Sequence, residues 1–112
     1  MANSRDILED IFDEVGLPVV IGSWGENEVA RFPFLEYHID ETDNLHADGR
    51  IFQKIDVWQI SVYGKLADMK AYEDAVEATE KAMDDRSLDY YATGNIFFDD
   101  CVYCEFSFSL LR

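Results

Sequence analysis

Basic residues are scarce in this 112-residue chain, which has 9 Lys and Arg against 24 Asp and Glu and a formal net charge of −15. A protein that wraps nucleic acid needs cations that displace counterions from phosphates, so this balance argues against direct DNA binding. It argues equally against contact with an anionic membrane surface. The excess of carboxylates favours solubility, a surface that repels DNA, or a basic protein partner.

Long apolar runs are missing as well. No run approaches the ~20 residues that a membrane-spanning helix needs, and the acidic start, MANSRDILEDIFDEVG, lacks the apolar segment of a signal peptide. We therefore expect a cytoplasmic protein without a membrane partner.

The chain has only two cysteines, Cys101 and Cys104, in an expected strand. Residues three apart on a strand point to opposite faces, so this pair is expected to form neither a disulfide nor a metal site.

Catalytic and nucleotide-binding motifs are also absent. The sequence has no Walker glycine loop, no GxGxxG and no GxSxG elbow around Ser23. Its two histidines are His38, expected to point outward from a strand, and His46. The carboxylates are spread over the chain, so no close pair for acid–base chemistry can be inferred. We expect no enzyme activity and no cofactor.

The chain does contain enough apolar residues for a core, with 48% hydrophobic residues, and it predicts a single domain over residues 1–112. Two segments show helical periodicity. The first covers about 4–15, with Asn3 or Ser4 as its cap, and ends before Gly16 and Pro18. The second covers 68–85 with Asp68 as its cap. Its expected buried residues are Tyr72, Ala75, Val76, Thr79 and Met83.

The remaining segments predict strands. They are a short strand over 19–24, an alternating strand over 34–40, a long strand over 51–64, and two strands within 88–112. Ile55 and Val57 share the face of Gln59, so the long strand is expected either to be partly covered on both faces or to carry a bulge. A tight turn is expected at Asp99–Asp100 in the last pair. In the long strand, the expected core residues are Trp58, Ile60 and Val62, and the expected outward residues are Gln59 and Ser61. The last strand is expected to bury Val102, Cys104, Phe106, Phe108 and Leu110.

These elements predict an α+β fold in the order α-β-β-β-α-β-β. The apolar stripes of the helices need a surface, and one-sided strands supply it. We therefore expect a mostly antiparallel sheet with both helices packed on one face and a long hairpin that projects beyond the sheet.

The acidic segment 40–50 is expected to form a polar loop near the tip of this hairpin. Its possible metal ligands are Asp40, Glu41, Asp43, His46 and Asp48. They match the calcium-binding EF-hand loop only loosely, because Gly49 comes late and no bidentate Glu follows. A solvated loop or an arm that contacts another protein is the favoured interpretation. The predicted contact residues are Asp40, Glu41, Asp43, Asn44, Leu45, His46, Asp48 and Arg50.

Sheet edges and aromatic residues also indicate interaction. An open edge offers unpaired backbone groups to a neighbouring strand. Five aromatic residues lie outside the expected core face of the last strand: Tyr90, Tyr91, Phe97, Phe98 and Tyr103. They would form either an exposed contact patch or a second small core.

The order of several motifs resembles the tail-terminator, or head–tail joining, proteins of long-tailed phages and prophages. GLPV follows the acidic helix, and VYCEFSFSL resembles the closing strand of that family. The matching positions are Pro33, Phe34 and Tyr37; Ala47, Asp48 and Gly49; and Phe52, Lys54, Trp58, Ile60, Val62 and Tyr63. The family commonly has Asn at the position of Gly49 and Tyr at that of Phe52. The resemblance covers nearly the whole chain.

The resemblance implies a structural virion protein. Such a protein forms a ring, expected to be a hexamer, that caps the tail tube, ends tube polymerisation and meets the head connector. DNA passes through the lumen without specific binding. The implied partners are further copies of the chain, the tail tube protein and the head connector or completion protein. The implied place is the tail at the head–tail interface of the virion, after assembly in the host cytoplasm.

Two other hypotheses remain open. The chain could be a monomeric acidic module, similar to a DNA mimic, that binds a basic partner tightly and in a salt-sensitive way. It could also be a small hydrolase or metal enzyme, which would need His38 or His46 beside clustered carboxylates.

Overall fold

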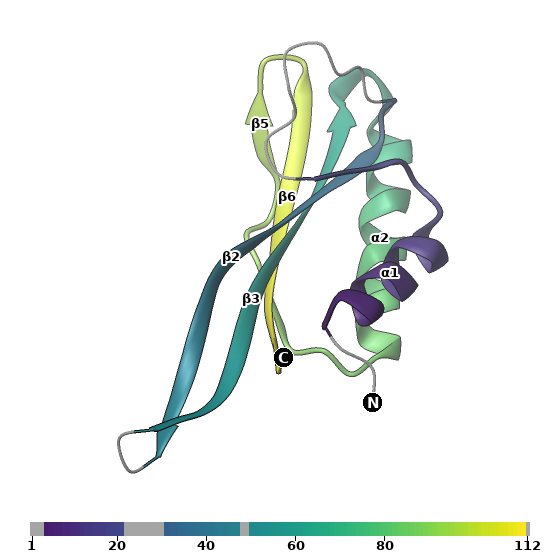
Figure 1. Cartoon of the computed structure of the whole chain (residues 1–112). Coiled ribbons are helices and arrows are strands. Elements are labelled where there is room, and N and C mark those ends of the chain that lie inside the picture. The colour runs from purple at the N-terminus through teal and green to yellow at the C-terminus, as the bar shows by residue number, and fades with distance from the viewer. Residues whose placement is uncertain (1–3, 22–30, 48–49, 112) are drawn as a thin grey trace.

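The computed structural model describes residues 4–21, 31–47 and 50–111, of which residues 4, 5, 21, 40–47, 50–54 and 111 are described by their backbone alone. Figure 1 shows one twisted sheet with both helices on the same face. The elements are α1 (Ser4–Val15), β1 (Val19–Ile21), β2 (Phe34–Ala47), β3 (Arg50–Lys65), η1 (Leu66–Asp68), α2 (Met69–Asp85), β4 (Tyr90–Ala92), β5 (Ile96–Phe98) and β6 (Cys101–Leu111).

The sheet has the order β1-β2-β3-β6-β4, and β5 also pairs with β6. The β1–β2 pair is parallel and the other four pairs are antiparallel. The predicted α+β class and the packing of both helices on one face are confirmed. The C-terminal region differs from the prediction, because residues 90–111 form three strands instead of two. Gly94, with a φ of 80°, lies in the short irregular segment between β4 and β5, which both run antiparallel to β6.

Local signals place both helices where the sequence predicts them. The α1 helix ends at Gly16, which has a φ of 71° and donates its backbone N–H to the Phe12 carbonyl at 2.9 Å. The Asp68 carboxylate caps α2 by accepting the Ala71 N–H at 3.2 Å. The residues that α2 buries are Tyr72, Ala75, Thr79, Ala82 and Met83. Val76 is only half-buried, and Ala82 was not predicted.

The core lies between the helices and the face of β3 and β6 that the period-2 pattern identified. From β3 it includes Trp58, Ile60 and Val62, and from β6 Val102, Cys104, Phe106, Phe108 and Leu110. Leu8 and Ile11 of α1 pack onto the same cluster. The predicted turn at Asp99–Asp100 is present between β5 and β6.

The opposite face of the sheet is partly covered, which was one of the two expectations for the long strand, and its residues Gln59 and Ser61 are less exposed than predicted. Ser61 is buried, with 1% of its surface exposed, and Gln59 is half-buried. Phe34 on this face stacks on Tyr63, and Tyr63 stacks on Tyr103, with ring centroids 5.0 Å apart in both pairs. Aromatic neighbours across the strands therefore cover small polar residues on a face that the alternation alone assigned to solvent.

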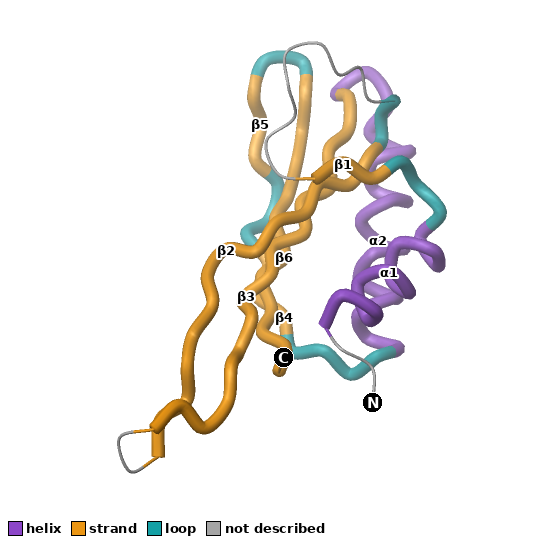
Figure 2. The backbone as a smooth tube through the Cα atoms, in the orientation of Figure 1, coloured by secondary structure: helices purple, strands orange, loops and turns teal. Residues whose placement is uncertain are grey.

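The largest correction concerns residues 40–50, which were expected to form a loop. The β2 strand continues to Ala47 and β3 begins at Arg50, so most of this segment is a strand. The last pair between β3 and β6 joins Ile55 to Leu111. Beyond it, within the described residues, β2 and β3 pair only with each other. We call the end of this hairpin, residues 40–47 and 50–54, the arm (Figure 2). The arm is two-stranded from Asn44 and Lys54 onward, whereas residues 40–43 lie beside the part of β3 that also pairs with β6.

Candidate interaction surfaces

The arm makes the molecule elongated, with principal extents of 54 × 31 × 22 Å. Figure 1 shows it extending well past the body of the sheet. Its pairing register shifts twice, between Ile39 and Glu41 and between Leu45 and His46. The first shift leaves Asp40 as an extra residue in β2. The second leaves Phe52 as an extra residue in β3, the strand for which a bulge was one of two expectations. Bulges bend a strand and increase its twist.

The predicted contact residues occupy both strands of this arm. The β2 side carries Asp40, Glu41, Asp43, Asn44, Leu45 and His46, and Arg50 begins β3. Asp48 lies outside the described residues, as do the surroundings of the other seven side chains. The seven described positions therefore lie near one end of the β2–β3 hairpin, and their contacts with a partner stay a prediction.

Two sheet edges are open within the described part of the chain. On the first edge, β1 pairs with Leu35–Tyr37 of β2, and no described strand lies beside the remainder of β2, residues 38–47. On the second edge, β4 and β5 pair with β6 only as far as Phe108. Open edges with unpaired N–H and C=O groups are sites where strands of another chain can add.

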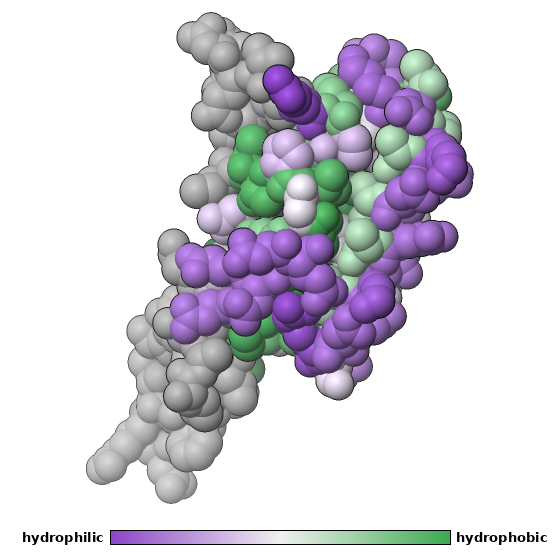
Figure 3. Space-filling model, turned by 90° about the vertical axis from the view of Figure 1, so that its right-hand side faces the viewer, coloured by the Kyte–Doolittle hydropathy of each residue, from purple (hydrophilic) through white to green (hydrophobic). Residues whose placement is uncertain are grey.

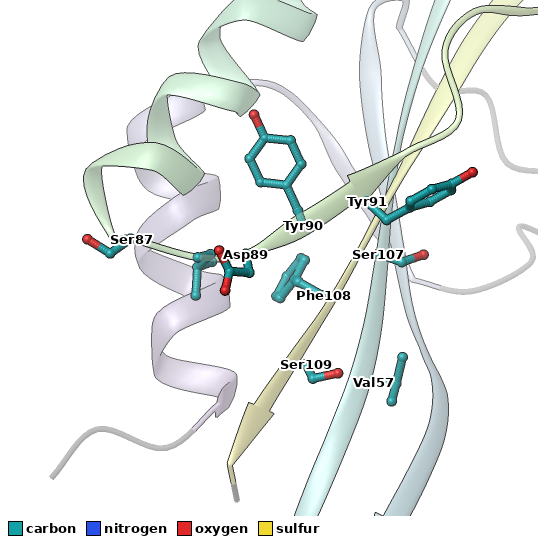
Figure 4. Close-up of a pocket in the computed structure, with 9 residues that line it drawn as sticks. Val57, Ser87, Asp89, Tyr90, Tyr91, Ser107, Phe108 and Ser109 are labelled. Atoms are coloured by element: carbon teal, nitrogen blue, oxygen red, sulfur yellow. The ribbon is translucent and has the colours of Figure 1, made fainter.

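An open groove lies beside the uncovered end of β6 (Figure 4). Its volume is about 630 Å³, and residues 87–91 form one wall. Val57 of β3 and the β6 residues Ser107, Phe108 and Ser109 form the other. No local pattern in the sequence indicates this groove, because residues of three separate segments build it.

The five aromatic residues singled out in the sequence divide into two groups. Tyr90 packs edge-to-face on Phe106 with centroids 5.4 Å apart, and Tyr103 belongs to the stack with Tyr63. The other three are largely exposed: Tyr91 at 73%, Phe97 at 61% and Phe98 at 67%. Part of the aromatic area is therefore exposed, as expected, and it lies on the short edge strands β4 and β5.

The helix layer differs from this edge in its chemistry. Figure 3 shows the helix side of the molecule, where hydrophilic residues form broad bands with apolar residues between them. The α1 helix has five carboxylates and one basic residue, and α2 has six and two. Much of the excess negative charge therefore lies on one face of the sheet.

A small polar cluster lies on the face opposite the helices. Glu36 pairs across the strands with the buried Ser61, which pairs with Glu105 on its other side. His38 Nδ1 lies 3.4 Å from Glu36 Oε1. Burial raises the pKa of Glu36, and the nearby His38 opposes that rise. Burial and the carboxylate of Glu36 raise the pKa of Tyr63 to about 12.

This cluster predicts how stability depends on pH. Because the pKa of Glu36 is raised on folding, the folded state binds more protons than the unfolded chain just above the ordinary glutamate range. Stability should therefore fall as pH rises through the raised pKa. Glu36→Gln removes this titration, so it should increase the unfolding midpoint at pH 7 and flatten its decline between pH 4 and 7.

Thermal unfolding across this pH range would test the expectation. Glu73→Gln on the exposed face of α2 is the matched control, and it should leave the shape of the pH profile unchanged. A Glu36→Gln protein that is less stable than the wild type at pH 7 would show that the ionised Glu36 stabilises the fold.

The described residues contain no group of three or more His, Cys, Asp and Glu that could hold a metal ion. Cys101 is half-buried on the face opposite the helices, Cys104 is buried in the core, and both are free. Burial raises the pKa of the Cys104 thiol, which disfavours the reactive thiolate. No helix in the described ranges has both the length and the apolar character needed to cross a membrane.

Comparison with known proteins gives a structural likeness alone. No family model matches the chain, and no curated protein matches it. Sixteen chains of solved structures do match. One is a chain from a structure described as the virion of a native gene transfer agent particle, with a TM-score of 0.55 and 14% sequence identity. The match covers 97% of the present chain and 90% of that chain. At this identity the likeness shows a shared fold.

Proposed function

We propose that this protein is a structural component of a phage-like virion that forms a ring at the end of the tail tube. The ring ends tube polymerisation and joins the tail to the head connector, and DNA passes through its lumen. The observation that carries this proposal is the fold likeness to a chain of a gene transfer agent virion over 97% of the present chain. The order of sequence motifs that resembles tail-terminator proteins points the same way.

The arrangement of the sheet suits a ring. A closed ring of identical subunits needs two different patches on each subunit, which meet head to tail. The described chain offers two unlike edges, the long open edge of β2 and the end of β6 beside the groove. The arm extends β2 past the body of its own sheet in a molecule 54 Å long, so its strands are available for contact with a neighbouring subunit or with the tube.

The charge suits a channel for DNA. Six copies would carry a formal charge of about −90, six times the −15 of one chain. A negatively charged lumen repels phosphates, so DNA would slide through it instead of binding. The proposal gives the chain no catalytic role and no cofactor.

The direct test is tube growth with the tail tube protein of the same particle. With this protein present, we expect tubes that stop growing and carry a ring at one end in electron micrographs. Light scattering across a concentration series should give six times the 12.9 kDa of one chain, either in solution or for the complex that caps the tube. Tubes that grow to the same lengths with and without the protein, with bare ends, would overturn the proposal.

The acidic helix layer supports a second candidate, a monomeric module that binds a basic protein partner. Five and six carboxylates on the two helices of one layer offer a broad anionic surface. This candidate predicts a monomer at every concentration and no effect on tube growth, so the same two measurements distinguish it from the ring.

A further inference from the structure

The edge of β6 away from β3 is covered along most of its length. The β5 strand pairs with Cys101–Tyr103, and β4 pairs with Phe106–Phe108. Between them, Thr93 donates its N–H to the Glu105 carbonyl at 3.1 Å, and its hydroxyl oxygen accepts the Glu105 N–H at 3.1 Å. Pairing along this edge of β6 ends at Phe108. Residues 109–111 have no second neighbour among the described strands, although they remain paired with β3.

The groove at this uncovered end is suited to an extended chain that offers hydrogen-bond acceptors. Three serines line it, Ser87, Ser107 and Ser109, and none of their hydroxyls has a hydrogen-bond partner within the described residues. The Ser87 hydroxyl points away from β6, so Ser107 and Ser109 are the donors on the β6 side (Figure 4). Asp89 is the one ionisable carboxylate in the lining. Figure 4 shows Ser107 and Ser109 along β6, across from the segment that contains Ser87 and Asp89. A strand added here would gain both backbone pairing and hydroxyl donors.

The β2 side of the arm has the matching chemistry. Its open edge, residues 38–47, has the sequence HIDETDNLHA, which is rich in carboxylate and amide acceptors. The arm cannot reach the groove of its own chain, because β2 and the uncovered side of β6 lie on opposite edges of the sheet, with β3 between the two strands. Any contact between these surfaces therefore joins two copies.

We propose that residues 38–47 of one copy add as a strand to the uncovered end of β6, residues 109–111, in the groove of the next copy. This inference rests on the proposed ring and names the contact that closes it. Each copy gives an arm to one neighbour and a groove to the other, which is the head-to-tail geometry that a closed ring requires. The half-buried apolar side chains of Val57 and Leu88 would lose solvent contact when the arm enters.

Disulfide trapping tests this pairing. In a Cys101→Ser background, Ser109→Cys is combined in turn with a cysteine at position 42, 43 or 44 of the arm. After mild oxidation, we expect a ladder of cross-linked species on a non-reducing gel. Because successive strand residues point to opposite faces, 42 and 44 should behave alike and 43 differently. The matched control replaces Ser109→Cys with Asp10→Cys, an exposed position on α1, and should give no ladder.

Four outcomes are distinguishable. An oligomer with an alternating ladder supports the arm-in-groove contact. An oligomer with no ladder, or with equal cross-linking at all three positions and in the Asp10→Cys control, overturns the contact and leaves the ring intact. A monomer that forms no ladder but still ends tube growth overturns the contact and keeps the proposed function. A monomer that forms no ladder and leaves tube growth unchanged overturns both.

Discussion

Gly64→Val is expected to destabilise the fold severely. Gly64 lies on the helix face of β3, and a Cβ atom there would be 2.5 Å from Tyr72 Cβ and 2.8 Å from Tyr72 Cδ1. The Tyr72 side chain cannot easily move away from this contact, because its ring is buried and its hydroxyl donates a hydrogen bond to Asn95 Oδ1 at 2.7 Å. Overpacking a core costs about 1–3 kcal/mol and occasionally more, against a total stability of about 5–15 kcal/mol for a typical domain. Gly64→Ala should lie in this range, and valine above it, in urea unfolding followed by circular dichroism.

Two further variants separate crowding from backbone effects. The nearest atom is the Cβ of Tyr72, so Tyr72→Ala cannot relieve the clash, and Gly64→Ala/Tyr72→Ala should be less stable than either single variant. Gly94 has a φ of 80°, and a Cβ atom added there would meet nothing within 4 Å. Gly94→Ala should therefore cost only the left-handed backbone penalty of about 1–2 kcal/mol. A Gly64→Ala protein as stable as the wild type would mean that α2 does not pack this closely on β3.

The elements that the sequence predicted well are those with a local apolar period. The last strand alternates five apolar residues with polar ones, so its buried face could be assigned directly, and the structure buries all five. Both helices combine an apolar stripe with a cap or a glycine stop, as at Asp68 and Gly16. In these segments, local pattern and tertiary packing favour the same structure.

The arm shows where this reasoning fails. Residues 40–47 have no apolar alternation in the sequence, and a polar segment without a period resembles a loop. They form a strand because β3 supplies backbone partners along its whole length. That pairing is a long-range property, so it cannot be deduced from the segment alone.

Burial on the outer sheet face could be predicted only as one of two alternatives, for a related reason. Ser61 and Gln59 alternate with core residues and therefore appeared to face water. Whether such a face is solvated depends on which residues the neighbouring strands place beside it. Here Glu36 and Glu105 flank Ser61, and a stack of aromatic rings fills the next row. The strand register decides which residues lie beside each other on this face and therefore whether it is solvated, and the sequence alone does not give the register.

Phe106→Ala should be among the most destabilising single changes, at about 3–5 kcal/mol for a buried phenylalanine. Phe106 is 1% exposed, pairs with Ile60 in β3 and packs on Tyr90. Phe98→Ala is the matched control, because it removes the same ring from the neighbouring strand β5, where 67% of the side chain is exposed. It should change stability by no more than about 0.5 kcal/mol in urea unfolding. An equally large loss for Phe98→Ala would show that Phe98 belongs to a second small core, whereas a stable Phe98→Ala protein would leave this ring available for a partner.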